Sequence, residues 1–254
     1  MNPALLFLAA GLLAGLANTL FHLRYHHVPL YLDPRSVVGD PEAVPWPPRV
    51  WGLATLAVAG VLLVVGGFHP GLAAPFTLAA LLGLRQHEVG TYGPEIVVRL
   101  GKYAPASACL LGWWVARTIS LALGHPGAEA DAHGWDAASG VFGGCYVLAG
   151  IAKLRESGWA WGRAENMSLM LAERGFGRWG SLRLWLAQQR PACGLIGATG
   201  LWIELGAVAF VYAPLRPAFA VGVVLFKLFT WVLFGYFEPE WVFTVIAIGL
   251  AAAA

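Results

Sequence analysis

Lys153 lies near the end of the apolar stretch YVLAGIAKLRESGWAWG, which covers residues 146–162. A charge close to hydrocarbon costs free energy, so the amine either escapes to water or serves a function. In one interpretation the lysine stem lies in lipid and its ammonium reaches the headgroups. In the other, Lys153 faces the interior of a helix bundle, where desolvation favours the neutral amine and makes it available as a general base. The stretch is apolar on every face, so spacing alone does not decide between them.

Three further charges lie deep in apolar segments. Glu204 stands in the middle of GLWIELGAVAF, and an intramembrane carboxylate is a functional hypothesis by default. Lys227 lies in the next apolar segment at about the same distance from the turn between the two, so a rise of about 1.5 Å per residue puts both at one depth. We therefore expect a structural ion pair between Glu204 and Lys227, with Arg117 as a competing cation.

His87 belongs to the stretch RQHEVGTYGPE, residues 85–95. The glycines and the proline of this stretch predict a loop beside an apolar segment. A buried histidine can donate a hydrogen bond to a developing anion or carry a proton. The alternative is an ordinary histidine at the membrane interface.

The histidines His22, His26 and His27 form an H-x3-H-H pattern after the first apolar run. Residues four apart share one face of a helix, and imidazole binds iron, copper or zinc. This cluster makes a metal-dependent oxidase or hydroxylase an alternative function. We do not expect a metal, because membrane di-iron enzymes use several such clusters and the chain has seven histidines in all.

The composition indicates an integral membrane protein. Of the 254 residues, 58% are hydrophobic and only 12% are charged, whereas soluble domains carry about 25% charged residues. A net charge of +2 gives no reason to expect a nucleic-acid partner. The three cysteines lie in or beside apolar runs without C-x-x-C spacing, which favours small buried side chains over disulfides.

Eight apolar runs are candidates for membrane-spanning helices, since a span needs about 20 mostly apolar residues. They cover residues 4–21, 51–68, 71–84, 103–123, 137–154, 194–213, 217–237 and 241–254. The third and the last are short, so six to eight spans are expected. The prediction is an all-α, polytopic transmembrane helix bundle in which residues 1–254 form a single integral membrane domain.

The basic residues follow this topology. Lys and Arg concentrate on cytoplasmic loops, and here they gather in the connections at residues 22–50, 85–102 and 155–190. The connection at residues 124–136 has acidic residues and no Lys or Arg, so it is assigned to the outside, with both termini. Apolar residues recur at three- and four-residue spacing among arginines in residues 155–191, which predicts amphipathic helices on the cytoplasmic surface.

Parts of the chain resemble a known family. The stretch YVLAGIAKLRESGWAWGRAENMSLML resembles the signature of the horizontally transferred transmembrane family, which includes vitamin K-dependent γ-carboxylases. The family pattern is an aromatic residue, A-G-x-x-K-L, a short gap and W-x-x-G. The matching residues are Tyr146, Ala149, Gly150, Lys153, Leu154, Trp159 and Gly162. The acidic position of GLWIELGAVAF and the histidine of LRQHEVGTYG are similar to family positions, whereas Lys227 stands where the family often has histidine.

The resemblance implies a reaction. Lys153 would be the base that deprotonates a hydroquinone, and His87 would stabilise the resulting anion. Glu204 would be structural or handle protons, and with Trp159, Tyr146 and Arg117 it is assigned to the substrate site. We expect a small enzyme of a bacterial inner membrane that acts with a quinone/hydroquinone or another lipid-soluble substrate. The alternative from another class is a non-catalytic membrane subunit that docks a protein partner.

Overall fold

The structure is a computed structural model that describes residues 2–24, 45–67, 70–92, 105–173, 179–234 and 238–253. These residues form helices and no strand, so the predicted all-helical class is confirmed. The long helices are α1 (Pro3–Arg24), α2 (Pro48–Val65), α3 (Pro70–Tyr92), α5 (Pro105–Ala122), α6 (Gly127–Ser157), α9 (Arg190–Gly206), α10 (Arg216–Phe234) and α11 (Pro239–Ala253). Shorter elements are the 3₁₀ turns η3 (Gly158–Gly162), η4 (Ala207–Val211) and η5 (Ala213–Leu215), with helices α7 (Ala164–Glu173) and α8 (Gly180–Gln188).

Proline occupies the first position of α1, α2, α3, α5 and α11. Its missing N–H costs nothing in the first turn of a helix, where the amide has no intrahelical partner, and its fixed φ suits the helix. These prolines therefore set the starting points of the helices, while the apolar runs that follow them supply the packing surface.

Within the described ranges, five helical segments are long and apolar enough to cross a membrane. They are Pro3–Phe21, Pro48–Val65, Gly127–Gly162, Arg190–Val211 and Ala213–Phe234. The predicted count of eight spans is not confirmed. The 15 residues of α11 reach only about 22 Å at 1.5 Å per residue, less than the roughly 30 Å of a bilayer core. Neither α3 nor α5, which carry His87 and Arg117, is among the five.

Two predicted connections are helical instead. Helix α6 begins at Gly127, so most of the predicted outer loop at residues 124–136 is its first turns. Helix α3 continues to Tyr92, so the predicted loop at residues 85–95 is helical over most of its length. Residues 124–136 contain the helix formers Ala and Glu, and residues 85–95 contain Gln and Glu. Low hydropathy lowers the membrane propensity of both segments without lowering their helix propensity.

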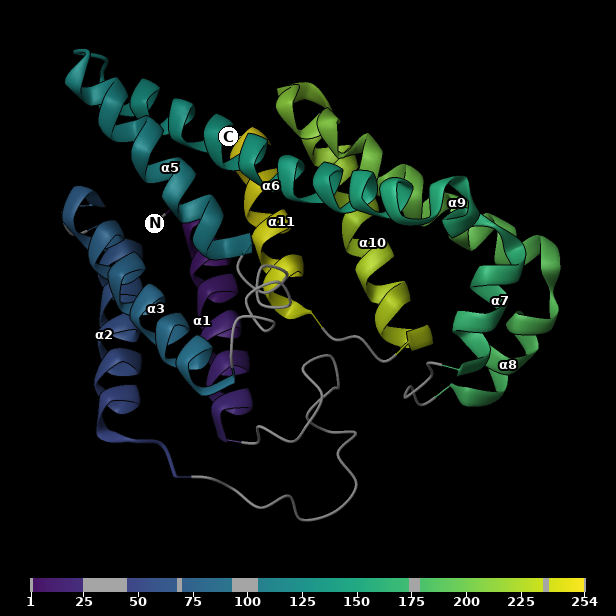
Figure 1. The fold of residues 1–254 in the computed structure, drawn as a ribbon. Coiled ribbons are helices and arrows are strands. Elements are labelled where there is room, and N and C mark those ends of the chain that lie inside the picture. The colour runs from purple at the N-terminus through teal and green to yellow at the C-terminus, as the bar shows by residue number, and fades with distance from the viewer. Residues whose placement is uncertain are drawn as a thin grey trace.

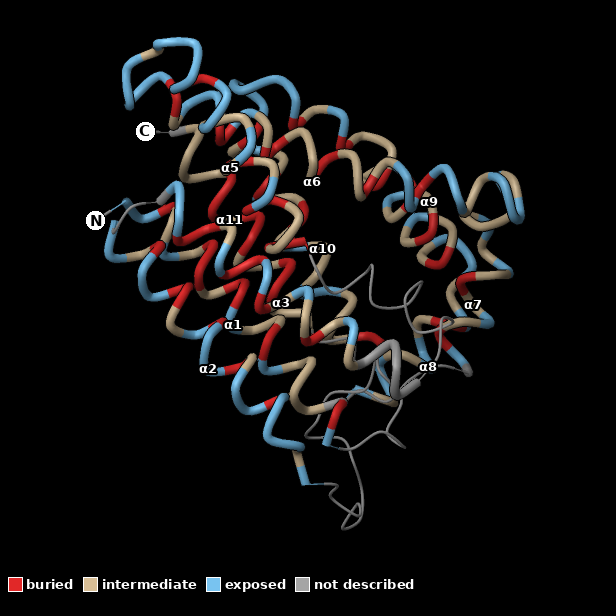
Figure 2. Tube along the Cα trace, turned by 60° about the vertical axis from the view of Figure 1, so that its left-hand side comes forward, coloured by how far each residue is buried: buried red, intermediate tan, exposed pale blue. Residues whose placement is uncertain are grey.

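The long helices pack in an arrangement with one central region (Figure 1). Helix α1 lies against α11, α2 against α3, and α5 against α6. Helix α6 runs across the upper part of the view, over α11 and α10, toward α9 and the short helices α7 and α8. Buried segments gather where α1, α5, α6 and α11 meet (Figure 2), with Leu8, Leu110, Phe142 and Ile248 among their most buried side chains.

Large apolar side chains are also exposed on the outer faces of several helices. Leu62 on α2 is 63% exposed, Trp202 on α9 64% and Leu225 on α10 61%. Exposed apolar surface of this extent indicates contact with an apolar environment, and the hydrocarbon core of a bilayer is one such environment.

Gly143 on α6 is a point of close approach that tests this packing. A Cβ at this position would lie 2.6 Å from the carbonyl oxygen of Ala207, whereas a Cβ at Gly144 would meet nothing within 4 Å. Gly143→Ala is expected to lower the free energy of unfolding by about 1–3 kcal/mol through overpacking. Gly144→Ala is expected to leave it unchanged or raise it, because alanine favours the helix. Unfolding in detergent micelles measures both, and equal behaviour of the two variants would contradict the α6–η4 contact.

Candidate functional site

An ion pair between Lys153 and Glu204 joins α6 to α9. The Lys153 ammonium donates a hydrogen bond to Glu204 Oε1. The Lys153 side chain is 26% exposed and that of Glu204 only 9%. Glu204 Oε2 is buried and has no hydrogen-bond partner in the described part of the chain. Lys153 is therefore directed toward a neighbouring helix, and the carboxylate that holds it keeps one acceptor unused.

Glycines allow α6, η3 and α9 to approach one another. A Cβ at Gly150, one turn before Lys153, would lie 3.2 Å from the Cβ of Glu204. A Cβ at Gly197 would lie 2.9 Å from the carbonyl oxygen of Gly162. Two glycines of the family-like stretch, Gly150 and Gly162, thus supply the close contacts that bring the ion pair together.

The tryptophan that contacts the lysine is Trp161. Its ring centroid lies 5.0 Å from Lys153 Nζ, a distance suited to a cation–π interaction. Trp159, which was assigned to the substrate site, lies on the same 3₁₀ turn, η3, and is 64% exposed. The local 3₁₀ geometry of η3 directs Trp161, and not Trp159, to the amine.

The expected pair between Glu204 and Lys227 was wrong. Lys227 Nζ lies 2.5 Å from Glu238 Oε2, on the segment that leads into α11. The expectation assumed two regular helices joined by a short turn. Instead, η4 and η5 follow α9, and a 3₁₀ helix has a different rise and about three residues per turn. The Glu204 face of α9 packs on α6, so its partner comes from there.

Tyr146 lies beside Lys227. Lys227 Nζ is 5.6 Å from the centroid of the Tyr146 ring and 4.7 Å from that of Trp241. The Tyr146 hydroxyl is buried without a hydrogen bond of ordinary length to any described residue. Tyr146, Gly150 and Lys153 follow at four- and three-residue spacing, so they share one face of α6. This face of α6 therefore contacts two lysine sites, Lys153 directly and Lys227 through Tyr146.

Arg117 lies elsewhere. Its Nε is 2.5 Å from Asp131 Oδ1, which joins α5 to the first turns of α6, and its guanidinium lies 5.5 Å from the Trp113 ring centroid. It does not compete for Glu204. A related contact pairs Arg216 of α10 with Asp136 of α6 at 2.7 Å.

His87 is half-buried near the end of α3. Helix α3 packs on α2 and α5, whereas Lys153 lies where α6 meets α9. The ends of α3 and α6 lie far apart in Figure 1, so the structure does not bring the two predicted catalytic residues together.

The predicted histidine cluster lies largely beyond the described residues. His22 is on α1, without a described side chain, and His26 and His27 are outside the described ranges. Among the residues that the structure does describe, no group of three or more His, Cys, Asp or Glu side chains is arranged to hold a metal ion.

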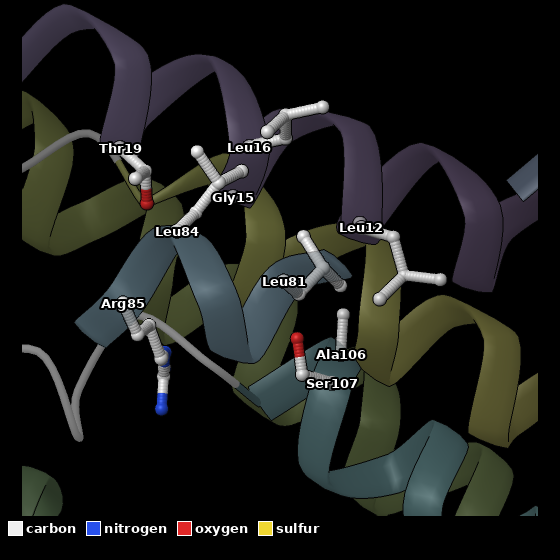
Figure 3. A pocket seen from close by; sticks show the side chains of 10 residues that line it. Leu12, Gly15, Leu16, Thr19, Leu81, Leu84, Arg85, Ala106 and Ser107 are labelled. Carbon is white, nitrogen blue, oxygen red and sulfur yellow. The ribbon is translucent and has the colours of Figure 1, made fainter. Parts of the chain in front are cut away.

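Two cavities border the helices. The first, between α1, α3 and α5, has a volume of about 20 Å³ and carries Thr19, Ser107 and Arg85 on its walls (Figure 3). That is room for about one water molecule, too little for an aromatic ring. The second is an apolar hollow of about 230 Å³ between α9 and α10, bordered by Ile203, Leu215 and Gly222 among others.

Comparisons with models of protein families, with curated proteins and with solved structures found no match to this chain.

Sequence reasoning missed several residues of these sites. Glu238 and Glu240 flank Pro239 directly before the last apolar run, and two carboxylates at such a boundary were the available signal. Trp161 and Gly197 carried no signal beyond their residue types, because their roles depend on how η3 turns against α9.

A double-mutant cycle tests the ion pair. Lys153→Met and Glu204→Gln are each expected to cost about 1–3 kcal/mol of unfolding free energy, because each leaves a buried polar partner unsatisfied. The double variant is expected to cost less than their sum, as measured by chemical unfolding in detergent. The control cycle uses Arg190 and Glu165, an exposed pair 3.9 Å apart, which should show almost no coupling. Additive effects at Lys153 and Glu204 would refute the pair.

Proposed function

We propose that this chain is a small integral membrane enzyme of the horizontally transferred transmembrane type, in the inner membrane of a bacterium, which deprotonates a quinol or another lipid-soluble acid. The observation that carries the proposal is the Lys153–Glu204 ion pair. It joins the lysine of the family-like stretch to an intramembrane carboxylate whose second oxygen is buried without a described partner.

The pair supplies a base by moving one proton. In an apolar surrounding, the proton of the Lys153 ammonium passes along the hydrogen bond to the Glu204 carboxylate, which leaves a neutral amine and a neutral carboxyl. The amine then accepts the proton of a substrate hydroxyl, and the new ammonium faces the substrate anion. Glu204 holds the first proton during this step, so its unused oxygen and its burial fit a proton-holding role.

The surroundings suit an aromatic, hydrocarbon-bearing substrate. The ring of Trp161 lies beside the amine, and the apolar hollow between α9 and α10 includes Ile203, the residue before Glu204. We assign the hydrocarbon chain of the substrate to this hollow. The proposal rests on Lys153 and Glu204 and does not include His87, which lies on a distant helix.

Lys153→Ala tests the proposal. The variant is expected to fold and insert, yet to lose turnover of an added hydroquinone by at least 100-fold, because general-base catalysis contributes about 10²–10⁴. Mass spectrometry of co-purifying lipid-soluble molecules should show a quinone with the wild type and less of it with the variant. Arg155→Ala, at an exposed position two residues along α6, is the control and should keep both properties. Normal turnover in Lys153→Ala would refute the proposal.

Gly222→Leu tests the assignment of the hollow. A Cβ at Gly222 would meet nothing within 4 Å, so a leucine fills the hollow without disturbing the backbone. The variant is expected to retain a long-chain quinone several-fold less well than the wild type. Its turnover of a quinol without a side chain should be unchanged. Gly52→Leu on α2, where a Cβ also meets nothing, is the matched control, and equal losses in both variants would contradict the assignment.

A second candidate function is a non-catalytic subunit. It is favoured by the ion pairs that join different elements, namely Arg117–Asp131, Lys153–Glu204, Arg216–Asp136 and Lys227–Glu238. Such pairs are sufficient to hold a bundle together without catalysis. Purification from native membranes distinguishes the two: a stoichiometric protein partner without a retained quinone supports the subunit, and an unaccompanied protein with a quinone supports the enzyme.

A further inference from the structure

Glu240 is a buried carboxyl group with no side-chain partner among the described residues. It stands in the first turn of α11 and is 1% exposed, and neither of its side-chain oxygens makes a hydrogen bond to a described residue. Burying an isolated carboxylate costs far more free energy than burying a neutral carboxyl group. The side chain is therefore stable at this place only when its charge is removed or balanced.

The charged groups that act on Glu240 come from α10 and the start of α11. Lys227 of α10 and Glu238 act on it electrostatically, and Lys227 Nζ is hydrogen-bonded to Glu238 Oε2 at 2.5 Å. Tyr146 of α6 is within electrostatic reach of Lys227, Glu238 and Glu204.

Among the described residues, the charges of the neighbouring helices α1 and α5 lie elsewhere: Arg24 is the last residue of α1, and Arg117 of α5 is paired with Asp131. A Cβ at Gly11 of α1 would meet the Glu240 carbonyl oxygen, the Thr244 hydroxyl and Ala106 of α5. The Thr244 hydroxyl already donates to that carbonyl, so its proton is not available to the Glu240 carboxylate.

The charges of Lys227, Glu238 and Glu240 together determine how many protons these three side chains hold. One ammonium and two carboxylates in an apolar interior carry a net charge of −1, and a single added proton makes the cluster neutral. We propose that Lys227, Glu238 and Glu240 form a proton-binding site that holds one exchangeable proton, shared between the two carboxyl groups. This inference is independent of the proposed enzyme activity, because it concerns a different lysine and needs no substrate.

The two carboxyl groups differ in their access to the outside. The Glu238 side chain is 20% exposed, so it can exchange a proton with the outside, whereas Glu240 is sealed. When the Lys227 ammonium leaves Glu238 for Glu240, the proton leaves the Glu240 carboxyl and binds the Glu238 carboxylate. Only an O–H bond is broken and another formed, and the cluster remains neutral in both arrangements.

Infrared spectroscopy of the full-length protein in detergent tests the site. The wild type at neutral pH is expected to show the C=O stretch of a protonated carboxyl group that shifts in deuterated water. Glu240→Gln should lose this band, whereas Glu204→Gln, which removes the carboxyl group protonated in the proposed enzyme step, should keep it. Glu165→Gln, at a side chain that is 64% exposed, should keep it. Identical spectra of the wild type and Glu240→Gln would overturn the proposal.

Two further variants keep the test decisive if Glu240→Gln fails to fold. Glu238→Gln leaves one ammonium and one carboxylate, which need no proton, so the band should disappear although Glu240 is intact. Lys227→Gln leaves two buried carboxyl groups that both protonate, so the band should grow about twofold. A band that is unchanged in both variants would overturn the proposal. The proposal would also be overturned if the wild type lacked the band and its thermal stability rose with sodium chloride but not with choline chloride.

Discussion

A charge inside an apolar bundle has to be neutralised by an opposite charge or by a proton, and this requirement fixes which elements of this protein meet. Lys153 of α6 pairs with Glu204 of α9, and Lys227 of α10 pairs with Glu238 at the start of α11. Van der Waals packing between apolar helices is weakly directional, because one leucine-rich face serves as well as another. Ion pairs are directional, so they select the rotation and the depth at which each helix stops.

Small residues make these pairs geometrically accessible. The short reach of a glutamate allows contact only if the two backbones come close, and Gly150 and Gly197 provide that approach on either side of Glu204. The family-like stretch therefore has two inseparable parts. The glycines Gly150 and Gly162 set the distance between α6, η3 and α9, and Lys153 depends on that distance to reach Glu204. A bulky side chain at either glycine would therefore displace the amine without contacting it.

The sequence was sufficient to predict the helices but not their partners. Each apolar run contains a helix, because roughly 20 apolar residues have few other ways to satisfy their backbone in hydrocarbon. That Lys153 and Glu204 each need a partner could be predicted from the cost of their charges. Their mutual contact could not, since it depends on the rotation of α9 and on the 3₁₀ turns after it. The polar start of α6 was missed because hydropathy measures burial in lipid and not helix formation, and Glu240 because only the fold shows how deeply it is buried.

Helix α6 is longer than a bilayer is thick. Its 31 residues extend about 46 Å at 1.5 Å per residue, against a hydrocarbon core of roughly 30 Å. A rod of that length relieves hydrophobic mismatch by tilting or by projecting beyond the lipid. Asp131 and Asp136 are tied to other helices near one end and Lys153 near the other. A change in bilayer thickness that alters the tilt of α6 therefore changes the depth of Lys153 relative to the ion pairs at the other end of the helix. Membrane thickness is thus itself a variable that acts on the amine.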